Sequence, residues 1–326
     1  LPVVSLYVQT DSGDGLKEIN KLRGYTEKMN GIYMRDTITP VGTDRLLPIQ
    51  VRTYDTQVDG ISYEIRSMDM DRLIADATIE DYEQTKEKIS ASLPIQNLLE
   101  ENREYLLIIK LSSGENAISY YTRIIEEQNC YVDECVSFAM DFHEKTFDEV
   151  QSKDLAAYLE PNASGDNSTF NKVDIHSSLK QVAWGDFACE RLTTPVPSVK
   201  EINMSYTVVI LDYLVGATKA NGEMEYYNVE EYYRVRYTSD RMYLLNYERN
   251  MEQIFRAESA EVYDNYIQLG IRDQNVEFSS NEKGNIVAFV QQGELWCYNE
   301  AANQLSRVFS FIGSEGIDDR ENYGEH

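Results

Sequence analysis

Histidine is the side chain best suited to proton transfer near neutral pH, and this chain has only His143, His176 and His326. Asp174 precedes His176 by two residues, and Asp186 follows it by ten. A carboxylate beside an imidazole fixes its tautomer and raises its basicity, so these residues could form a general base. The alternative, which we favour, is that the internal histidines lie at the edge of a helix or of the core.

Motifs for established catalytic chemistry are absent from the sequence. It contains no Gly-x-Ser-x-Gly elbow, phosphate-binding loop, His-Glu-x-x-His pair or dinucleotide fingerprint. The cysteines are too sparse for a disulfide framework and too far from histidines for a zinc site, so buried thiols are expected. They are Cys130, Cys135, Cys189 and Cys297. We expect no catalytic residue, cofactor or metal, and a non-enzymatic role is favoured over an enzymatic one.

A tyrosine-rich stretch between Met204 and Tyr247 favours recognition. Its three runs alternate like β-strands, in which successive side chains point to opposite faces. If Tyr233 points inward, the opposite face carries tyrosine and arginine, a combination common in binding hot spots. The candidate binding residues on that face are Tyr226, Tyr232, Arg234 and Arg236. The alternative is that such pairs across neighbouring strands only stabilise the sheet.

A second candidate site would be a pocket enclosed by the same sheet. A histidine backed by a carboxylate, together with inward-facing rings, would there bind or turn over a small molecule. Its residues would be His176, Asp186, Tyr206 and Tyr233. An interior filled by Phe142, Phe147 and Trp184 would exclude this site. Because a slip of one residue exchanges the two faces of a strand, the sequence leaves the exposed face open.

The charge of the chain restricts its partners. A net charge of −26 repels phosphate backbones, so nucleic acid is not expected as a partner. The hydrophobic content of 42% and the charged content of 26% are typical of a folded protein. An unknown protein or small molecule is the expected partner.

The first third of the chain predicts short strands separated by turns. Leu47–Tyr54 and Ile61–Met68 flank Asp59-Gly60, a pair typical of tight hairpins. Glu104–Leu111 and Ala117–Ile125 predict a second hairpin. Strands at this spacing indicate an all-β sandwich or a barrel-like domain.

The middle of the chain predicts helices followed by a long antiparallel sheet. Apolar residues recur at helical spacing in Tyr131–Val150, and Lys153–Leu159 and Val173–Val182 predict two shorter helices. This order of elements resembles the nuclear transport factor 2-like fold, in which a bent sheet and its helices form a cone. The resemblance covers about residues 128–250. It implies a scaffold that serves enzymes, ligand binders and structural modules, including modules of bacterial envelope proteins.

The end of the chain predicts three successive strands. They are Asn285–Val290, Gly293–Asn299 and Gln304–Phe311. They resemble one blade of a β-propeller, which needs about four blades to close. Either the protein continues past His326 with further blades, or these strands extend another sheet.

The sequence thus predicts a multi-domain α+β protein. Its parts are a β-rich domain at 1–127, an α+β cone-like domain at 128–250 and a β-strand segment at 251–326. Because the chain starts at Leu1 rather than Met, we expect either a signal peptide or a membrane tether upstream of that residue, which makes the protein secreted or membrane-anchored. No run of 18 apolar residues follows. The resulting hypothesis is an extracytoplasmic protein of the bacterial cell envelope that recognises a protein or a ligand.

Overall fold

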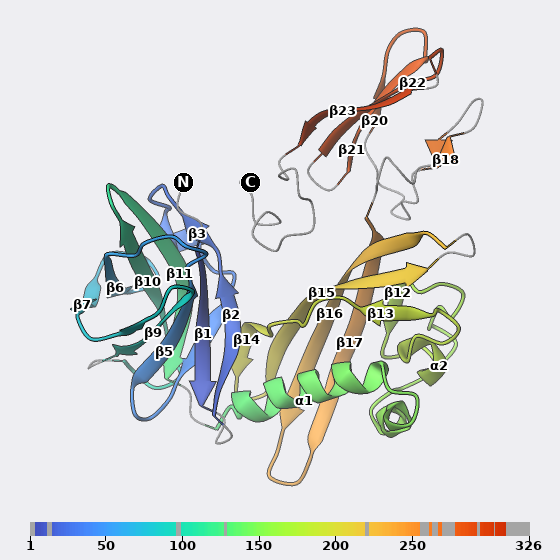
Figure 1. Cartoon of the computed structure of the whole chain (residues 1–326). Helices are drawn as coiled ribbons and strands as arrows, with labels where there is room; N and C mark the ends of the chain where they lie inside the picture. The colour runs from blue at the N-terminus through green and yellow to red at the C-terminus, as the bar shows by residue number, and fades with distance from the viewer. Residues whose placement is uncertain are drawn as a thin grey trace.

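The protein is mostly β, with several antiparallel sheets and few helical segments (Figure 1). The computed structural model describes residues 4–11, 15–95, 99–126, 129–218, 222–254, 261–262, 267–268, 278–291, 294–302 and 304–310. Among these residues, no helix is long and apolar enough to cross a membrane.

Two sheets face each other in the N-terminal part. The first has the order β2-β1-β5-β9-β8 and consists of β1 (Ser5–Asp11), β2 (Leu16–Leu22), β5 (Leu46–Arg52), β8 (Glu83–Gln84) and β9 (Lys88–Pro94). The second has the order β3-β11-β10-β6-β7, with β4 beside β11. Its strands are β3 (Gly24–Tyr25), β4 (Ile38–Val41), β6 (Gly60–Arg66), β7 (Leu73–Ile79), β10 (Glu104–Ser113) and β11 (Asn116–Glu126). The short 3-10 helix η1 (Gly31–Tyr33) precedes β4.

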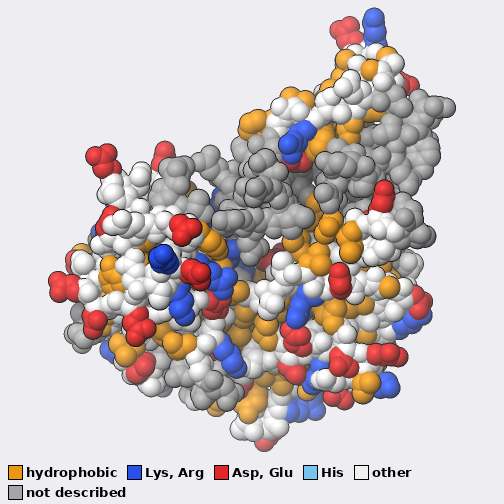
Figure 2. All heavy atoms as spheres, in the orientation of Figure 1, with side chains coloured by type: hydrophobic (Ala, Val, Ile, Leu, Met, Phe, Trp, Pro, Cys, Tyr) orange, Lys and Arg blue, Asp and Glu red, His pale blue; other side chains and the backbone are white. Residues whose placement is uncertain are grey.

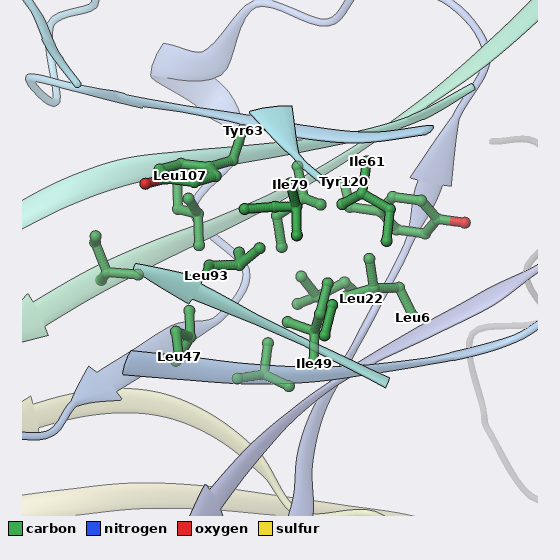
Figure 3. Packing of buried hydrophobic residues seen from close by; sticks show 14 of the residues in the cluster. Leu6, Leu22, Leu47, Ile49, Ile61, Tyr63, Ile79, Leu93, Leu107 and Tyr120 are labelled. Atoms are coloured by element: carbon green, nitrogen blue, oxygen red, sulfur yellow. The ribbon is translucent and has the colours of Figure 1, made fainter. Parts of the chain in front are cut away.

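Alternating apolar side chains fill the space between these two sheets. Ile61 and Tyr63 point into this space from β6, and Leu47 and Ile49 point into it from β5 on the other side; all four are buried (Figure 3). Each such aliphatic side chain contributes roughly 1.5–3 kcal/mol when it leaves water. This core therefore holds the two sheets together without a disulfide bond among the described residues.

One of the two expected hairpins is present. Glu104–Ser113 and Asn116–Glu126 pair as β10 and β11, as the sequence predicts. The hairpin across Asp59-Gly60 was a wrong prediction, because β5 and β6 belong to different sheets. The Asp59 carboxylate instead accepts a hydrogen bond from the backbone N–H of Gly114, at 2.6 Å, and so closes the turn between β10 and β11.

A six-stranded sheet with three long strands carries helices on one face in the middle part. Its order is β12-β17-β16-β15-β13, with β14 also beside β15. The strands are β12 (Lys172–Asp174), β13 (Cys189–Arg191), β14 (Ser198–Asn203), β15 (Tyr206–Thr218), β16 (Met224–Tyr237) and β17 (Met242–Gln253). The helical segments are α1 (Val132–Thr146), η2 (Gln151–Ala157) and α2 (Leu179–Val182). In Figure 1, α1 lies across the sheet, and its residues Ala139 and Phe142 are buried against it.

The first predicted helix is confirmed, and the second forms as a 3-10 helix. The third was a wrong prediction: residues 172–174 form a strand, and only Leu179–Val182 is helical. Val173 pairs with Arg249 of β17, so tertiary pairing overrides the local apolar spacing. The Ser178 side chain then accepts a hydrogen bond from the backbone N–H of Gln181, which starts α2 at the following residue.

Short strands form the C-terminal part. A four-stranded antiparallel sheet contains β20 (Phe278–Ser280), β21 (Ile286–Gln291), β22 (Glu294–Asn299) and β23 (Gln304–Ser310). A two-stranded sheet contains β18 (Glu261–Val262) and β19 (Ile267–Gln268). The three strands expected near the end of the chain are thus β21, β22 and β23.

A single buried asparagine connects the N-terminal strands to the middle part. The Asn20 side chain donates to the Ile38 carbonyl and to Thr39 Oγ1, both at 2.9 Å, and accepts from the Val199 backbone N–H at 2.7 Å. Its own backbone N–H donates to the Pro197 carbonyl at 2.8 Å. The backbone of Asn20 has φ 49°, a left-handed conformation that asparagine tolerates better than most residues. Asn20 therefore fixes β14 against the N-terminal sheets.

We expect Asn20→Ala to lower the free energy of unfolding by about 2–4 kcal/mol, because it leaves buried polar groups without partners. Urea unfolding followed by circular dichroism measures the change. The matched control is Asn228→Ala, which removes an exposed asparagine from β16. An effect of Asn20→Ala no larger than that of the control would contradict this role.

Candidate functional site

The most polar cluster in the interior surrounds the carboxylate of Glu231, which is fully buried. One carboxylate oxygen, Oε2, lies 2.8 Å from His143 Nδ1 and accepts a hydrogen bond from the Tyr233 hydroxyl at 2.8 Å. The other oxygen, Oε1, accepts from the hydroxyls of Tyr213 at 3.0 Å and Tyr247 at 3.2 Å. We call these five residues the Glu231 cluster. It joins α1 to β15, β16 and β17.

Arg191, which contacts the second ring nitrogen of His143, determines which nitrogen carries the imidazole proton. Arg191 Nη1 lies 2.9 Å from His143 Nε2 and 2.5 Å from Glu144 Oε1. A guanidinium has only donors, so Nε2 must accept, and the imidazole proton is on Nδ1. His143 therefore donates to Glu231.

Two opposing effects determine the charge of Glu231. Burial alone would raise the pKa of this carboxyl, because a low-dielectric interior disfavours the charged form. Burial is the largest single effect, but the hydrogen bonds from His143 and Tyr233 and the positive charge of Arg249 act together against it and exceed it. The pKa of Glu231 consequently lies below its ordinary value, and the carboxylate is ionised at neutral pH.

A buried arginine supplies the nearby positive charge. Arg249 donates to the carbonyls of Val182 at 2.7 Å and Gln181 at 3.0 Å, at the end of α2. Its guanidinium lies 3.6 Å from the centre of the Trp184 ring. The indole N–H of Trp184 in turn donates to Thr146 Oγ1 at the end of α1. Arg249 therefore ties β17 to both helices.

The Glu231 cluster is arranged for stability rather than for turnover. A carboxylate paired with histidine occurs in general bases, but Arg191 occupies the nitrogen that would accept a proton. His143 is itself fully buried, and Phe142 and Trp184 are buried around the same interior. In the described residues, no group of three or more His, Cys, Asp and Glu side chains could hold a metal ion.

The residues of the predicted pocket do not gather at one place. They are His176, Asp186, Tyr206 and Tyr233. Nδ1 of His176 lies 2.9 Å from Asn162 Nδ2 in a surface loop, and Asp186 pairs with Lys180 on the surface at 2.6 Å. The two tyrosines lie on opposite faces of the sheet: Tyr233 is fully buried, whereas Tyr206 contacts an outer arginine. The chain thus places each of these four residues in different surroundings.

Sequence reasoning missed Glu231 and Arg249, although a signal for each was present. Strand alternation that turns Tyr233 inward also turns Glu231 inward, two residues earlier. Arg249 likewise lies two residues after Tyr247 on β17, so both side chains point inward. A charged residue at an inward strand position predicts a buried polar cluster, because it needs partners there.

The outer face of the same sheet carries tyrosines and arginines at the end near the β16–β17 turn. The Arg234 guanidinium lies 3.8 Å from the centre of the Tyr206 ring. Arg236 and Arg241 lie 5.0 Å and 4.3 Å from the centre of the Tyr243 ring. We define the tyrosine–arginine face as Tyr206, Tyr232, Arg234, Arg236, Arg241 and Tyr243. Tyr226 is half-buried on the same side of β16, farther from the turn.

The arginines of this face differ from most others in the described chain. Arg234, Arg236 and Arg241 have no ion pair and no side-chain hydrogen bond there, and Arg234 Nε is buried without a partner. Elsewhere arginines pair with glutamates, as Arg45, Arg52, Arg66, Arg103, Arg123 and Arg191 do. Three neighbouring arginines without carboxylate partners in the described part of the structure are unexpected in so acidic a chain.

Carboxylates lie on the same outer face, farther from the turn. Asp212 of β15 stands opposite Glu230 of β16, so two like charges face each other across the strands. Part of Asp212 is open to solvent, yet the surrounding protein removes much of its hydration. This desolvation, with the charge of Glu230, raises the pKa of Asp212 to about 6.

The folded protein therefore holds the Asp212 proton more tightly than the unfolded chain does, and the free energy of unfolding falls as the pH rises through about 4 to 6. We expect Asp212→Asn to raise that free energy at neutral pH by ~0.5–1 kcal/mol, a small value because solvent screens exposed charges. At pH about 4 the gain should vanish, since the carboxyl is then protonated in the folded protein.

Thermal unfolding at the two pH values tests this expectation. Glu252→Gln, which removes an exposed carboxylate from β17 on the same face, is the control for net charge. An equal gain in both variants would show that Asp212 has no special environment.

Comparison with known proteins adds no relative. No protein-family model matches this chain, and no curated protein matches it significantly. A function for the tyrosine–arginine face must therefore be inferred from its charges, contacts and exposure.

Proposed function

We propose that this chain is a non-enzymatic, extracytoplasmic protein of the bacterial cell envelope that recognises a partner through the tyrosine–arginine face. The observation that carries the proposal is the set of three arginines that lie beside tyrosine rings and have no carboxylate partner among the described residues. Tyrosine and arginine are, with tryptophan, the residue types enriched at the hot spots of protein interfaces. The partner is a protein or a small ligand, and we favour a protein.

The stacked arginines would bind with a small loss of conformational freedom. A guanidinium held over an aromatic ring keeps its N–H donors at the ring edge, where they can reach a partner. The strands below are held in place by the Glu231 cluster, which joins them to α1. Binding to such a surface therefore avoids much of the entropy that ordering a flexible loop would cost.

A modular arrangement fits this role. We propose a β-rich unit at 1–127, an α+β unit at 128–250 that is similar to the nuclear transport factor 2-like cone, and a blade-like β segment at 251–326. The contact between α1 and the sheet of β15, β16 and β17 supports the second unit. The meander of β20 to β23 supports the third.

Affinity capture from an envelope extract tests the proposal, with Arg234→Ala/Arg236→Ala/Arg241→Ala as the variant. The captured partner is identified, purified and titrated against each protein. We expect the variant to bind at least about tenfold more weakly, because arginine hot spots each contribute above 1 kcal/mol.

The matched control is Arg23→Ala, since Arg23 also stands over a tyrosine ring, that of Tyr25, but in the N-terminal part. It should bind like the unmodified protein. A partner that binds the triple variant and the unmodified protein equally well would refute the proposed surface.

A further inference from the structure

We infer that the tyrosine–arginine face takes a compact pair of carboxylates on a partner protein segment whose neighbouring residues are basic. This inference rests on the proposed function and names the chemistry of its partner. Charge complementarity carries it, because the outer face has separate cationic and anionic ends on the same three strands.

The cationic end has unused donors of fixed direction. Arg234, Arg236 and Arg241 make neither ion pairs nor side-chain hydrogen bonds with the described part of the chain. Arg236 and Arg241 both stand beside one ring, that of Tyr243, so two positive charges are held near each other. A carboxylate placed between them would relieve this repulsion and accept paired hydrogen bonds from a guanidinium.

The guanidinium groups of Arg234 and Arg236 are spaced so that each can bind its own acceptor. Arg234 and Arg236 are two residues apart on one strand, so their Cα atoms are about 6.6 Å apart, since a strand rises about 3.3 Å per residue. In an extended partner, acidic side chains two residues apart lie on one face at the same spacing. A pair of carboxylates therefore fits this end better than one isolated charge.

The anionic end limits how much negative charge the partner can carry. Glu248 of β17 stands opposite Tyr232, and Asp212 and Glu230 face each other farther along the sheet. From Arg234 to Glu230 along β16 is about 13 Å at the usual rise of a strand. That distance exceeds the Debye length of about 8 Å at physiological salt, so Glu230 is largely screened from Arg234. Glu248 lies closer to the arginines and borders the cationic end, because its partner Tyr232 is only two residues from Arg234 on β16. A long polyanion would meet these carboxylates, whereas lysines would be attracted to them.

The charge of the whole chain agrees with a local anionic contact. Acidic side chains are spread over the face seen in Figure 2, with basic ones between them. The net charge of −26 repels nucleic acid, acidic polysaccharide and anionic lipid surfaces at long range. A peptide segment with both signs of charge escapes this repulsion.

Synthetic peptides and the full chain provide the test. The probe is a fluorescein-labelled peptide with two glutamates, a short neutral spacer and two lysines. Comparison probes carry only glutamates, only lysines, or phosphoserines in place of the glutamates. Fluorescence anisotropy at low and physiological salt gives the Kd for each. We expect the mixed-charge glutamate probe to bind at least about tenfold more tightly than either single-charge probe, because both ends of the face then contribute.

Variants assign the binding to the arginines. Arg234→Ala/Arg236→Ala/Arg241→Ala should weaken the mixed-charge probe at least about tenfold, and the corresponding triple lysine variant should recover only part of the loss, because lysine lacks the planar donor pair. Arg23→Ala should change nothing. Circular dichroism and the urea midpoint establish that each variant is folded.

The inference is overturned if no probe binds, if a single-charge probe binds as tightly as the mixed one, or if the arginine variant binds unchanged. Preference for the phosphoserine probe would overturn the choice of carboxylate. These outcomes differ from a failure of the proposed function. A natural partner that needs the three arginines but binds independently of salt leaves that function intact while refuting this inference.

Discussion

The buried carboxylate of Glu231 is the constraint on which the arrangement of the middle sheet depends. An ionised carboxylate in a protein interior is tolerated only when it is hydrogen-bonded, because the cost of leaving it unpaired is several kcal/mol or more. Its donors come from four different elements: His143 on α1, Tyr213 on β15, Tyr233 on β16 and Tyr247 on β17. Displacing any of these elements would remove a partner from a buried charge. The cluster therefore fixes their relative positions.

The same constraint determines which residues the sheet shows to solvent. A slip of one residue in β16 would turn Glu231 outward and Arg234 inward, which would lose the four hydrogen bonds to Glu231 and bury an unpaired cation. The register that satisfies Glu231 is also the register that places Arg234 and Arg236 on the outer face. The interior and the proposed binding surface are therefore two consequences of one strand register. Asn20 then holds this sheet, through β14, against the N-terminal strands.

Local patterns predicted much of the fold, and long-range contacts account for what they missed. Alternation predicted β15, β16 and β17 and the separation of Tyr232 from Tyr233, because it is a local property of a strand. The false hairpin at Asp59 and the false helix at 173–182 arose because strand pairing across the chain overrode local signals. The contact between His143 and Glu231 joins residues 88 positions apart, and no local pattern encodes it. The lack of carboxylate partners for the three arginines among the described residues likewise depends on the positions of acidic side chains that are distant in the sequence.

The titration of individual tyrosines tests the central claim most directly. Burial and the adjacent Glu231 carboxylate raise the pKa of Tyr213, Tyr233 and Tyr247 well above the ordinary value for a phenol. Nuclear magnetic resonance of protein labelled with ¹³C in its tyrosine rings, assigned with single Tyr→Phe variants, follows each ring as the pH rises. The account predicts that these three signals stay unchanged until the protein unfolds. A shift of any of them in the folded protein near the ordinary phenol pKa would show that its hydroxyl does not donate to a buried carboxylate.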